Sequence, residues 1–158
     1  MDMEITFKTA TIDDCEALCE IHISSIRELC REHHSDAEIE VWTKGRTPER
    51  YKSHINNQNV FIAQHKNTAV GFSTFNIKTG EIIQLYVHPE YAGKGVGSRI
   101  LVNILNIAEK ADLNEVHCNS SLNAEKFYLK AGFKAEEKCI NFINGGKVTC
   151  IPMRKSIK

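Results

Sequence analysis

No run of uninterrupted apolar residues in the sequence approaches the ~18 that a membrane-spanning helix needs, so no transmembrane helix is predicted. The first residues also lack the basic region and apolar core of a signal peptide. Neither charge is in excess, because 20 Lys and Arg residues balance 20 Asp and Glu residues. Proteins that hold nucleic acids or anionic membranes usually carry a basic excess. The sequence therefore predicts a cytoplasmic protein with no nucleic-acid and no membrane partner.

Cysteine and proline are also scarce. Six cysteines are too few for a disulfide framework in a chain of 158 residues, and none has the C-x-x-C spacing. His33 and His34 are adjacent, but no third ligand is suitably spaced, so no metal site is expected. The chain has three prolines, no internal repeat and no linker rich in Pro, Gly or Ser. Residues 1–158 are therefore expected to form one domain.

The hydrophobic period changes regularly along the chain. Three- and four-residue spacing of apolar residues predicts helices over residues 15–30, between Ser35 and Gly45, from Pro48 onward, and over 95–109 and 123–131. Alternating or continuous apolar segments predict strands at residues 4–9, 60–63, 69–77, 81–88, 116–119, 133–142 and 147–153. Residues 144–146, Asn-Gly-Gly, are typical of the turn of a hairpin. This order predicts an α+β (mixed α/β) fold in which helices pack on a mixed sheet.

Three of the nine glycines, Gly93, Gly95 and Gly97, fall within five residues, between a strand and a helix. Glycine lets main-chain N–H groups approach a ligand closely. A helix N-terminus adds unpaired N–H donors and the positive end of its dipole. We expect a phosphate or pyrophosphate site here, with Lys94 and Arg99 as further sources of positive charge. The alternative is a turn that glycine shapes only for packing.

The spacing of these glycines excludes two common phosphate sites. No G-x-x-x-x-G-K-[ST] sequence is present, so a P-loop is not predicted. The glycines give G-x-G-x-G rather than G-x-G-x-x-G, and they lie past the middle of the chain after antiparallel strands. A nicotinamide or flavin site is therefore disfavoured.

Residues 92–97, Ala-Gly-Lys-Gly-Val-Gly, resemble the pyrophosphate loop Q/R-x-x-G-x-G/A of the GCN5-related N-acetyltransferase (GNAT) superfamily, including its small bacterial members. Ala92 stands where the family has Gln or Arg, but main-chain N–H groups supply most of the phosphate binding there. Residues 123–133 resemble a second family segment, in the expected order and spacing. The resemblance extends from about residue 4 to the end. It implies a GNAT-like fold with a central, mostly antiparallel mixed sheet of about seven strands flanked by helices.

The resemblance implies transfer of an acetyl group from acetyl-CoA, without a metal, to an amine of a small molecule or protein. The amine would attack directly in a ternary complex. Dimers are common in the family, so the resemblance also admits a homodimer. The positions that would contact acetyl-CoA are Leu85, Tyr86, Val87, Ala92, Gly93, Lys94, Gly95, Val96, Gly97, Ser98, Asn123 and Tyr128.

Three of these positions match family residues with particular roles. Tyr128 matches the acid that protonates the departing thiolate, and a phenol of pKa ≈ 10 can donate to a thiolate. The Val87 main-chain N–H, on the same strand as Leu85, matches the donor to the thioester oxygen. Asn123 would contact the pantetheine arm.

The general base has several candidates. Glu81 lies eleven residues before Ala92, which is the spacing of the base glutamate in the histone-acetylating members of the family. A carboxylate at the start of a buried strand could have the raised pKa that suits a base. Other candidates are His117, His88 and a chain of water molecules.

The acceptor is expected between the first two helices and the strands. Arg27, Arg31 and Trp42 lie in this region together with His33 and His34, and they could hold a small polar or aromatic amine. His117 is a further candidate for contact with the substrate. A solvated helix face with Trp42 covering the core is the alternative interpretation.

A second function from another class stays open at this point. The chain could be a non-catalytic acyl-CoA-binding sensor or interaction module. Such a module would be free to lose both Tyr128 and a base, so their presence favours the enzyme.

Overall fold

The computed structural model describes residues 3–57 and 59–158. Its strands are β1 (Thr6–Thr9), β2 (Val60–His65), β3 (Thr68–Asn76), β4 (Glu81–Val87), β5 (Glu115–Ser120), β6 (Lys134–Ala135), β7 (Cys139–Ile143) and β8 (Gly146–Ser156). Its helices are α1 (Cys15–Leu29), α2 (Asp36–Thr43), α3 (Lys52–Asn56), α4 (Val96–Lys110) and α5 (Glu125–Lys130). Short 3₁₀ turns occur at Ile12–Asp14, Pro48–Tyr51, Pro89–Tyr91 and Leu122–Ala124.

The strands form one sheet in the order β1-β2-β3-β4-β5-β8-β6, and β7 pairs with β8 beside it. Every pair is antiparallel except β4 and β5. These two parallel strands pair only at Glu81–His117 and Ile82–Cys118, and then diverge. The sheet therefore opens into a V between its fourth and fifth strands.

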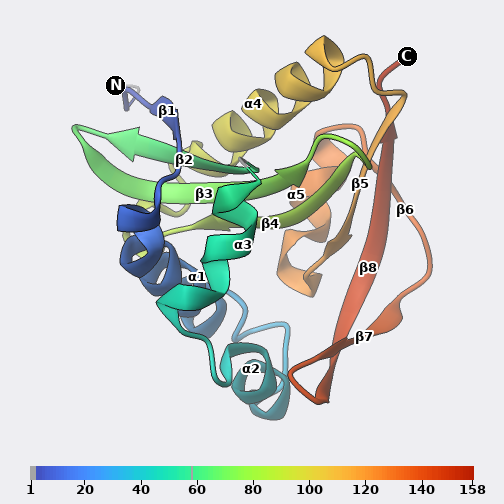
Figure 1. The fold of residues 1–158 in the computed structure, drawn as a ribbon. Helices are drawn as coiled ribbons and strands as arrows, with labels where there is room; N and C mark the ends of the chain where they lie inside the picture. Colours follow the sequence, from blue (N-terminus) through green and yellow to red (C-terminus); the bar gives the residue numbers. More distant parts are fainter. Residues whose placement is uncertain (1–2, 58) are drawn as a thin grey trace.

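Helices cover both faces of the sheet (Figure 1). Helices α4 and α5 pack on one face, where Ile100, Ile104 and Phe133 belong to the largest buried cluster. Helices α1 and α3 pack on the other face, where Leu18 and Ile55 contact strands β2 and β3. Burial of each such side chain is worth roughly 1.5–3 kcal/mol. Because α1 and α5 pack on opposite faces of the sheet, they lie on opposite sides of the V.

Helix α2 packs against the β7–β8 hairpin, and both lie at the same end of the molecule (Figure 1). Asn144 and Gly145 form the turn, and both have positive φ, which is the backbone of a type I′ hairpin. The predicted hairpin is therefore confirmed. Trp42 of α2 and Val148 of β8 belong to the same buried cluster.

The α+β fold class is confirmed, and the sheet has eight strands among the described residues instead of about seven. The expected strand over residues 133–142 is wrong, because the chain divides there into β6 and β7. Both pieces pair with β8, but four residue steps separate Ala135 from Cys139 while three separate their partners Met153 and Cys150. One extra residue therefore lies between the two pairs, and after the Glu136 N–H donates to the Pro152 carbonyl over 2.8 Å the regular pairing is interrupted until Cys139.

Candidate active site

The site lies where β4 leaves β5. Along β4, Gln84 pairs with Thr74 and Ile82 pairs with Phe75, so Ile83 is an extra residue that forms a bulge. The Thr74 hydroxyl donates to Oε1 of Gln84 over 2.7 Å and fixes that side chain just past the bulge. The bulge and the loss of pairing with β5 together separate the strands.

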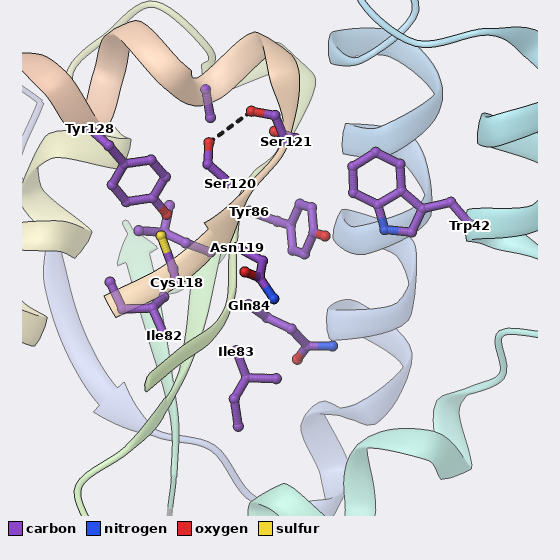
Figure 2. A pocket seen from close by; sticks show the side chains of 12 residues that line it. Trp42, Ile82, Ile83, Gln84, Tyr86, Cys118, Asn119, Ser120, Ser121 and Tyr128 are labelled. Carbon is purple, nitrogen blue, oxygen red and sulfur yellow. Dashed lines mark hydrogen bonds between the residues drawn. The ribbon is translucent and has the colours of Figure 1, made fainter. Parts of the chain in front are cut away.

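Two adjoining cavities occupy this opening and share Leu85, Tyr86, Ser121 and Ala124. The first, called here the slot, lies on the side of the glycine segment. Its lining residues are Ser25, Leu29, Cys30, Leu85, Tyr86, Val87, Gly97, Ser121, Asn123, Ala124 and Phe127. The second, called here the inner pocket, is shown in Figure 2. Its lining residues are Trp42, Ile82, Ile83, Gln84, Leu85, Tyr86, Cys118, Asn119, Ser120, Ser121, Ala124 and Tyr128.

The glycine segment leads into the N-terminus of α4. Gly93 and Gly95 have φ of 73° and 83°, a left-handed backbone that favours glycine, and α4 begins directly afterwards at Val96. The first N–H groups of this fifteen-residue helix have no partner within the helix. Gly97 brings the helix close to Phe127, because a Cβ atom on Gly97 would lie 3.4 Å from that ring. This geometry suits a phosphate at the mouth of the slot.

Two charged residues near this segment have different surroundings. Arg99 donates from Nη1 to the Met3 carbonyl over 2.8 Å and from Nη2 to the Ile5 carbonyl over 3.3 Å. Its guanidinium is thus held at the N-terminal segment, and its contribution of charge to a phosphate site stays a prediction. Lys94 is exposed, with Nζ 5.6 Å from the centre of the Tyr91 ring.

The N–H groups of β4 divide between its two neighbours. The His88 N–H donates to the Val70 carbonyl of β3 over 2.8 Å. Because N–H groups alternate in direction along a strand, the N–H groups of Val87 and Leu85 point toward the gap that β5 leaves. Both residues line the slot, so this part of β4 presents main-chain donors to it.

Tyr128 lies at the core side of the inner pocket and is 5% exposed. Its hydroxyl points toward the Cys118 thiol (Figure 2). Burial and the neighbouring Cys118 raise the pKa of Tyr128 well above its ordinary value of 10. The phenol is therefore protonated near neutral pH, as a proton donor must be.

Asn123 lies in the slot with an unsatisfied polar atom. Its Oδ1 is buried and accepts no hydrogen bond within the part of the chain that is described. Its side chain also lies against the Cys30 thiol, whose pKa burial raises to about 12. A buried acceptor without a donor costs free energy, and an amide of a bound ligand would remove that cost.

Tyr86 lines both cavities, and buried side chains that do not line them pack behind it. The His22 ring lies 4.1 Å from the Tyr86 ring between centroids, and His22 Nδ1 lies 2.8 Å from the Tyr51 hydroxyl. Burial lowers the pKa of His22 well below its ordinary 6.5, and the positive charges of Arg46 and Arg50 act in the same direction. His22 is therefore neutral.

Some of the predicted site residues come together here. Leu85, Tyr86, Val87, Gly97 and Asn123 line the slot, and Trp42 and Tyr128 line the inner pocket. Another group lies on the loop and first turn before the slot without lining it. This group is Ala92, Gly93, Lys94, Gly95, Val96 and Ser98, of which Val96 is buried in the core.

Other predicted residues line neither cavity. Arg27 and Arg31 are exposed, and Arg27 borders a groove on the outer face of α1. Glu81 and His117 pair at the closed end of the V. Strand alternation places both on the sheet face of Asn119, opposite Ile82 and Cys118.

The three remaining histidine candidates have structural partners or lie outside. His88 Nδ1 accepts from the Glu90 N–H over 3.2 Å, so His88 caps the short turn before the glycines. His34 is buried, and its Nε2 accepts from the Leu122 N–H over 3.0 Å. His33 is exposed.

Sequence reasoning missed several lining residues. Ser25 and Leu29 are four residues apart on α1 and Cys30 follows, so the helical period could have placed them on one face. Gln84 and Asn119 carried no local signal, because their meeting depends on where β4 and β5 separate.

No group of three or more His, Cys, Asp or Glu residues that could hold a metal ion occurs within residues 3–57 and 59–158. Over the same residues, no helix is long and apolar enough to cross a membrane.

Comparison with known proteins gives one consistent result. Residues 30–157 match the sequence model of the family described as an acetyltransferase (GNAT) domain. The chain is 29% identical over 148 residues to a Thermoplasma acidophilum protein named spermidine N(1)-acetyltransferase, covering 85% of this chain and 91% of the relative. It is 27% identical over 121 residues to YafP of Escherichia coli, an uncharacterized N-acetyltransferase, covering 77% and 75%.

Solved structures show the same architecture. A GCN5-related N-acetyltransferase from Rhodopseudomonas palustris superimposes with a TM-score of 0.92 at 25% identity, covering 99% of both chains. The PaiA N-acetyltransferase from Thermoplasma acidophilum, in complex with coenzyme A, has a TM-score of 0.78 at 25% identity. That alignment covers 98% of this chain and 99% of the PaiA chain.

Proposed function

Since the chain belongs to the GNAT acetyltransferase family, we propose that it transfers an acetyl group from acetyl-CoA to the amine of a small molecule by direct attack in a ternary complex. The observation that carries this proposal is the meeting of two cavities in the V between β4 and β5. One cavity suits the donor and the other suits the acceptor. The reacting groups would meet at the residues that both cavities share.

The donor would enter through the slot. Unpaired N–H groups at the N-terminus of α4 would hold the pyrophosphate, so a net positive charge is not required. The unpaired Oδ1 of Asn123 would accept from an amide of the pantetheine arm. Gly97 and Phe127 both line the slot, and a side chain at Gly97 would narrow it.

The thioester would lie beside β4. Its carbonyl oxygen gains negative charge as the amine attacks, and the N–H groups of Val87 or Leu85 would stabilise that charge. The C–S bond then breaks and the sulfur leaves as a thiolate. Tyr128, held protonated by its surroundings, would donate its proton to that sulfur or stabilise the thiolate by hydrogen bonding.

The attacking amine must first lose a proton. The inner pocket has no carboxylate in its lining, so a base would act through water. Glu81 is our candidate, because it shares a sheet face with Asn119 and lies just beyond the pocket at the closed end of the V. His117, its partner in the strand register, is the rival.

The pocket also indicates the class of acceptor. A polyamine carries additional cations, and buried cations need carboxylate partners. Trp42 and Tyr86 instead offer aromatic faces, and Gln84 and Asn119 offer amides. We therefore assign a small primary amine with an apolar or aromatic body, in contrast to the spermidine in the name of the Thermoplasma relative.

The test is acetylation of 2-phenylethylamine, spermidine and a peptide with a free N-terminus, with product detected by mass. Mass detection is preferred to thiol reagents because Cys139 is exposed and would react with them. We expect the highest kcat/KM with 2-phenylethylamine. A preference for spermidine would overturn the acceptor class alone. Binding of acetyl-CoA with no product from any amine would instead favour the non-catalytic acyl-CoA-binding module.

A further inference from the structure

A pair of thiols lies outside the slot and the inner pocket. Cys139 of β7 and Cys150 of β8 are direct partners in the antiparallel register, and their Sγ atoms are 3.2 Å apart. Both are free thiols. Partners on one face of an antiparallel pair have Cβ atoms about 4.5–5.5 Å apart. A small adjustment would bring the two Cβ atoms to the separation found in disulfides.

The two thiols differ in accessibility. Cys139 is exposed to solvent, whereas Cys150 is 4% exposed. Burial and the neighbouring Cys139 thiol raise the pKa of Cys150 to about 12. Cys150 is therefore protonated and shielded, so an oxidant in solution meets Cys139 first.

The hairpin that carries this pair also supports the acceptor side of the site. Asn144 Nδ2 donates to the Val41 carbonyl of α2 over 2.9 Å, and the Thr149 N–H donates to Glu38 Oε2 over 2.6 Å. Val148, two residues from Cys150 and on the same strand face, belongs to the cluster of Trp42. A disulfide between β7 and β8 would thus restrict the movement of the hairpin on which α2 packs.

We propose that Cys139 and Cys150 are a redox modification site, at which a low-molecular-weight disulfide such as oxidised glutathione forms a reversible cross-strand disulfide. The Cys139 thiolate attacks one sulfur of oxidised glutathione, which gives a mixed disulfide and releases one glutathione thiolate. Cys150 passes its proton to the released glutathione thiolate, and the Cys150 thiolate then attacks the Cys139 sulfur and releases the second glutathione as a thiolate. The two protons of the protein thiols end on the released glutathiones, so two protein thiols are oxidised and one glutathione disulfide is reduced.

The test is to incubate the folded full chain with oxidised glutathione and to map the peptides by mass without reduction. We expect the six free thiols to fall by two, with the peptides of Cys139 and Cys150 joined and the change reversed by a dithiol reductant. Limited proteolysis should then cut the hairpin more slowly than in the reduced protein. None of these measurements depends on acetyl transfer, so the result is independent of the proposed function.

Two variants complete the experiment. The Cys139→Ser variant lacks the exposed thiol that starts the reaction. Its remaining cysteines should therefore stay as free thiols. Cys15→Ala removes a buried thiol of α1 far along the chain and should form the cross-link as the parent does. A glutathione adduct that persists on Cys139, or a map that joins other cysteines, would overturn the proposal.

Discussion

His34 Nε2 accepts a hydrogen bond from the Leu122 N–H over 3.0 Å, and this bond joins the segment before α2 to the segment that begins α5. The two segments contribute Trp42, Ser121 and Asn123 to the opposite walls of the site. Only a neutral imidazole can accept at this nitrogen, and Nδ1 lies 3.4 Å from Glu38 Oε1. The spacing of the walls therefore depends on the protonation of one buried side chain.

This dependence predicts acid lability. Burial lowers the pKa of His34 from its ordinary 6.5, although Glu38 opposes the shift. Between the lowered pKa and 6.5 the unfolded chain binds more protons than the native one, so the free energy of unfolding decreases as the pH falls through this window. His22, with a pKa lowered further, adds to the effect. Urea unfolding at several pH values should show it.

His34→Gln keeps an acceptor and removes the titration, so its free energy of unfolding should vary less with pH. His33→Gln, at the exposed neighbouring position, should retain the slope of the parent. Equal slopes in the parent and in His34→Gln would show that protonation of His34 does not control the pH dependence of stability.

Tyr128→Phe tests the proton donor. Because the hydroxyl acts on the leaving thiolate rather than on binding, we expect kcat to fall by on the order of 10²-fold with little change in the Kd for acetyl-CoA. Tyr51→Phe is the matched control, since Tyr51 is 1% exposed and lines neither cavity. Calorimetry and initial rates give the two quantities. Unchanged turnover would remove Tyr128 from the mechanism.

Glu81→Gln and His117→Asn separate the two candidate bases. If Glu81 accepts the proton of the amine through water, Glu81→Gln should lower kcat/KM by about 10²–10⁴-fold. His117→Asn should keep the kcat/KM of the parent. The opposite pattern would transfer the role to His117, and parent-like rates in both variants would leave proton removal to solvent.

Gly97→Val tests the slot. A Cβ on Gly97 would lie 3.4 Å from Phe127 and 3.7 Å from Val87, so the methyl groups of valine must enter the space that the slot occupies. We expect the KM for acetyl-CoA to rise at least about tenfold, as the loss of ~1.4 kcal/mol of binding implies. Asn103→Val places the same residue later on α4, away from the slot, and should leave KM unchanged.

Gly146→Ala tests the contact between the hairpin and α2. A methyl group at Gly146 would overlap the Val41 side chain, and the overlap should cost roughly 1–3 kcal/mol of stability. The double variant Gly146→Ala with Val41→Ala removes the opposing methyl groups. Its loss should therefore be smaller than the sum of the two single losses, as measured by urea unfolding. If the losses in the free energy of unfolding were additive, the side chains at positions 146 and 41 would not be in energetic contact.

Much of the fold was predictable because it depends on local signals. The hairpin turn at Asn144-Gly145, the glycine segment and the helix after it each require particular residue types at adjacent positions. The family resemblance drawn from residues 92–97 and 123–133 is confirmed by the family match. The roles of Tyr128 and Asn123 stay predictions; Tyr128 lines the inner pocket and Asn123 lines the slot.

The remaining features depend on pairing between distant segments. The expected strand over residues 133–142 is interrupted because it has one residue more than the facing part of β8. The local sequence of residues 133–142 does not show this mismatch. Arg27 and Arg31 lie on or after a helix that borders the site, but helix rotation turns Arg27 outward and Leu29 inward. The amides of Gln84 and Asn119 meet only because β4 and β5 separate after two residue pairs.

That short seam has a mechanical consequence. The sheet consists of a half from β1 to β4 and a half from β5 to β8, and within the described residues the strand register joins them at two pairs only, Glu81–His117 and Ile82–Cys118. The slot is lined from both halves, with Val87 on one side and Phe127 on the other. A molecule bound there would clamp the halves together and raise the melting temperature with its concentration. The acyl donor would then be a structural component of the fold for as long as it stays bound.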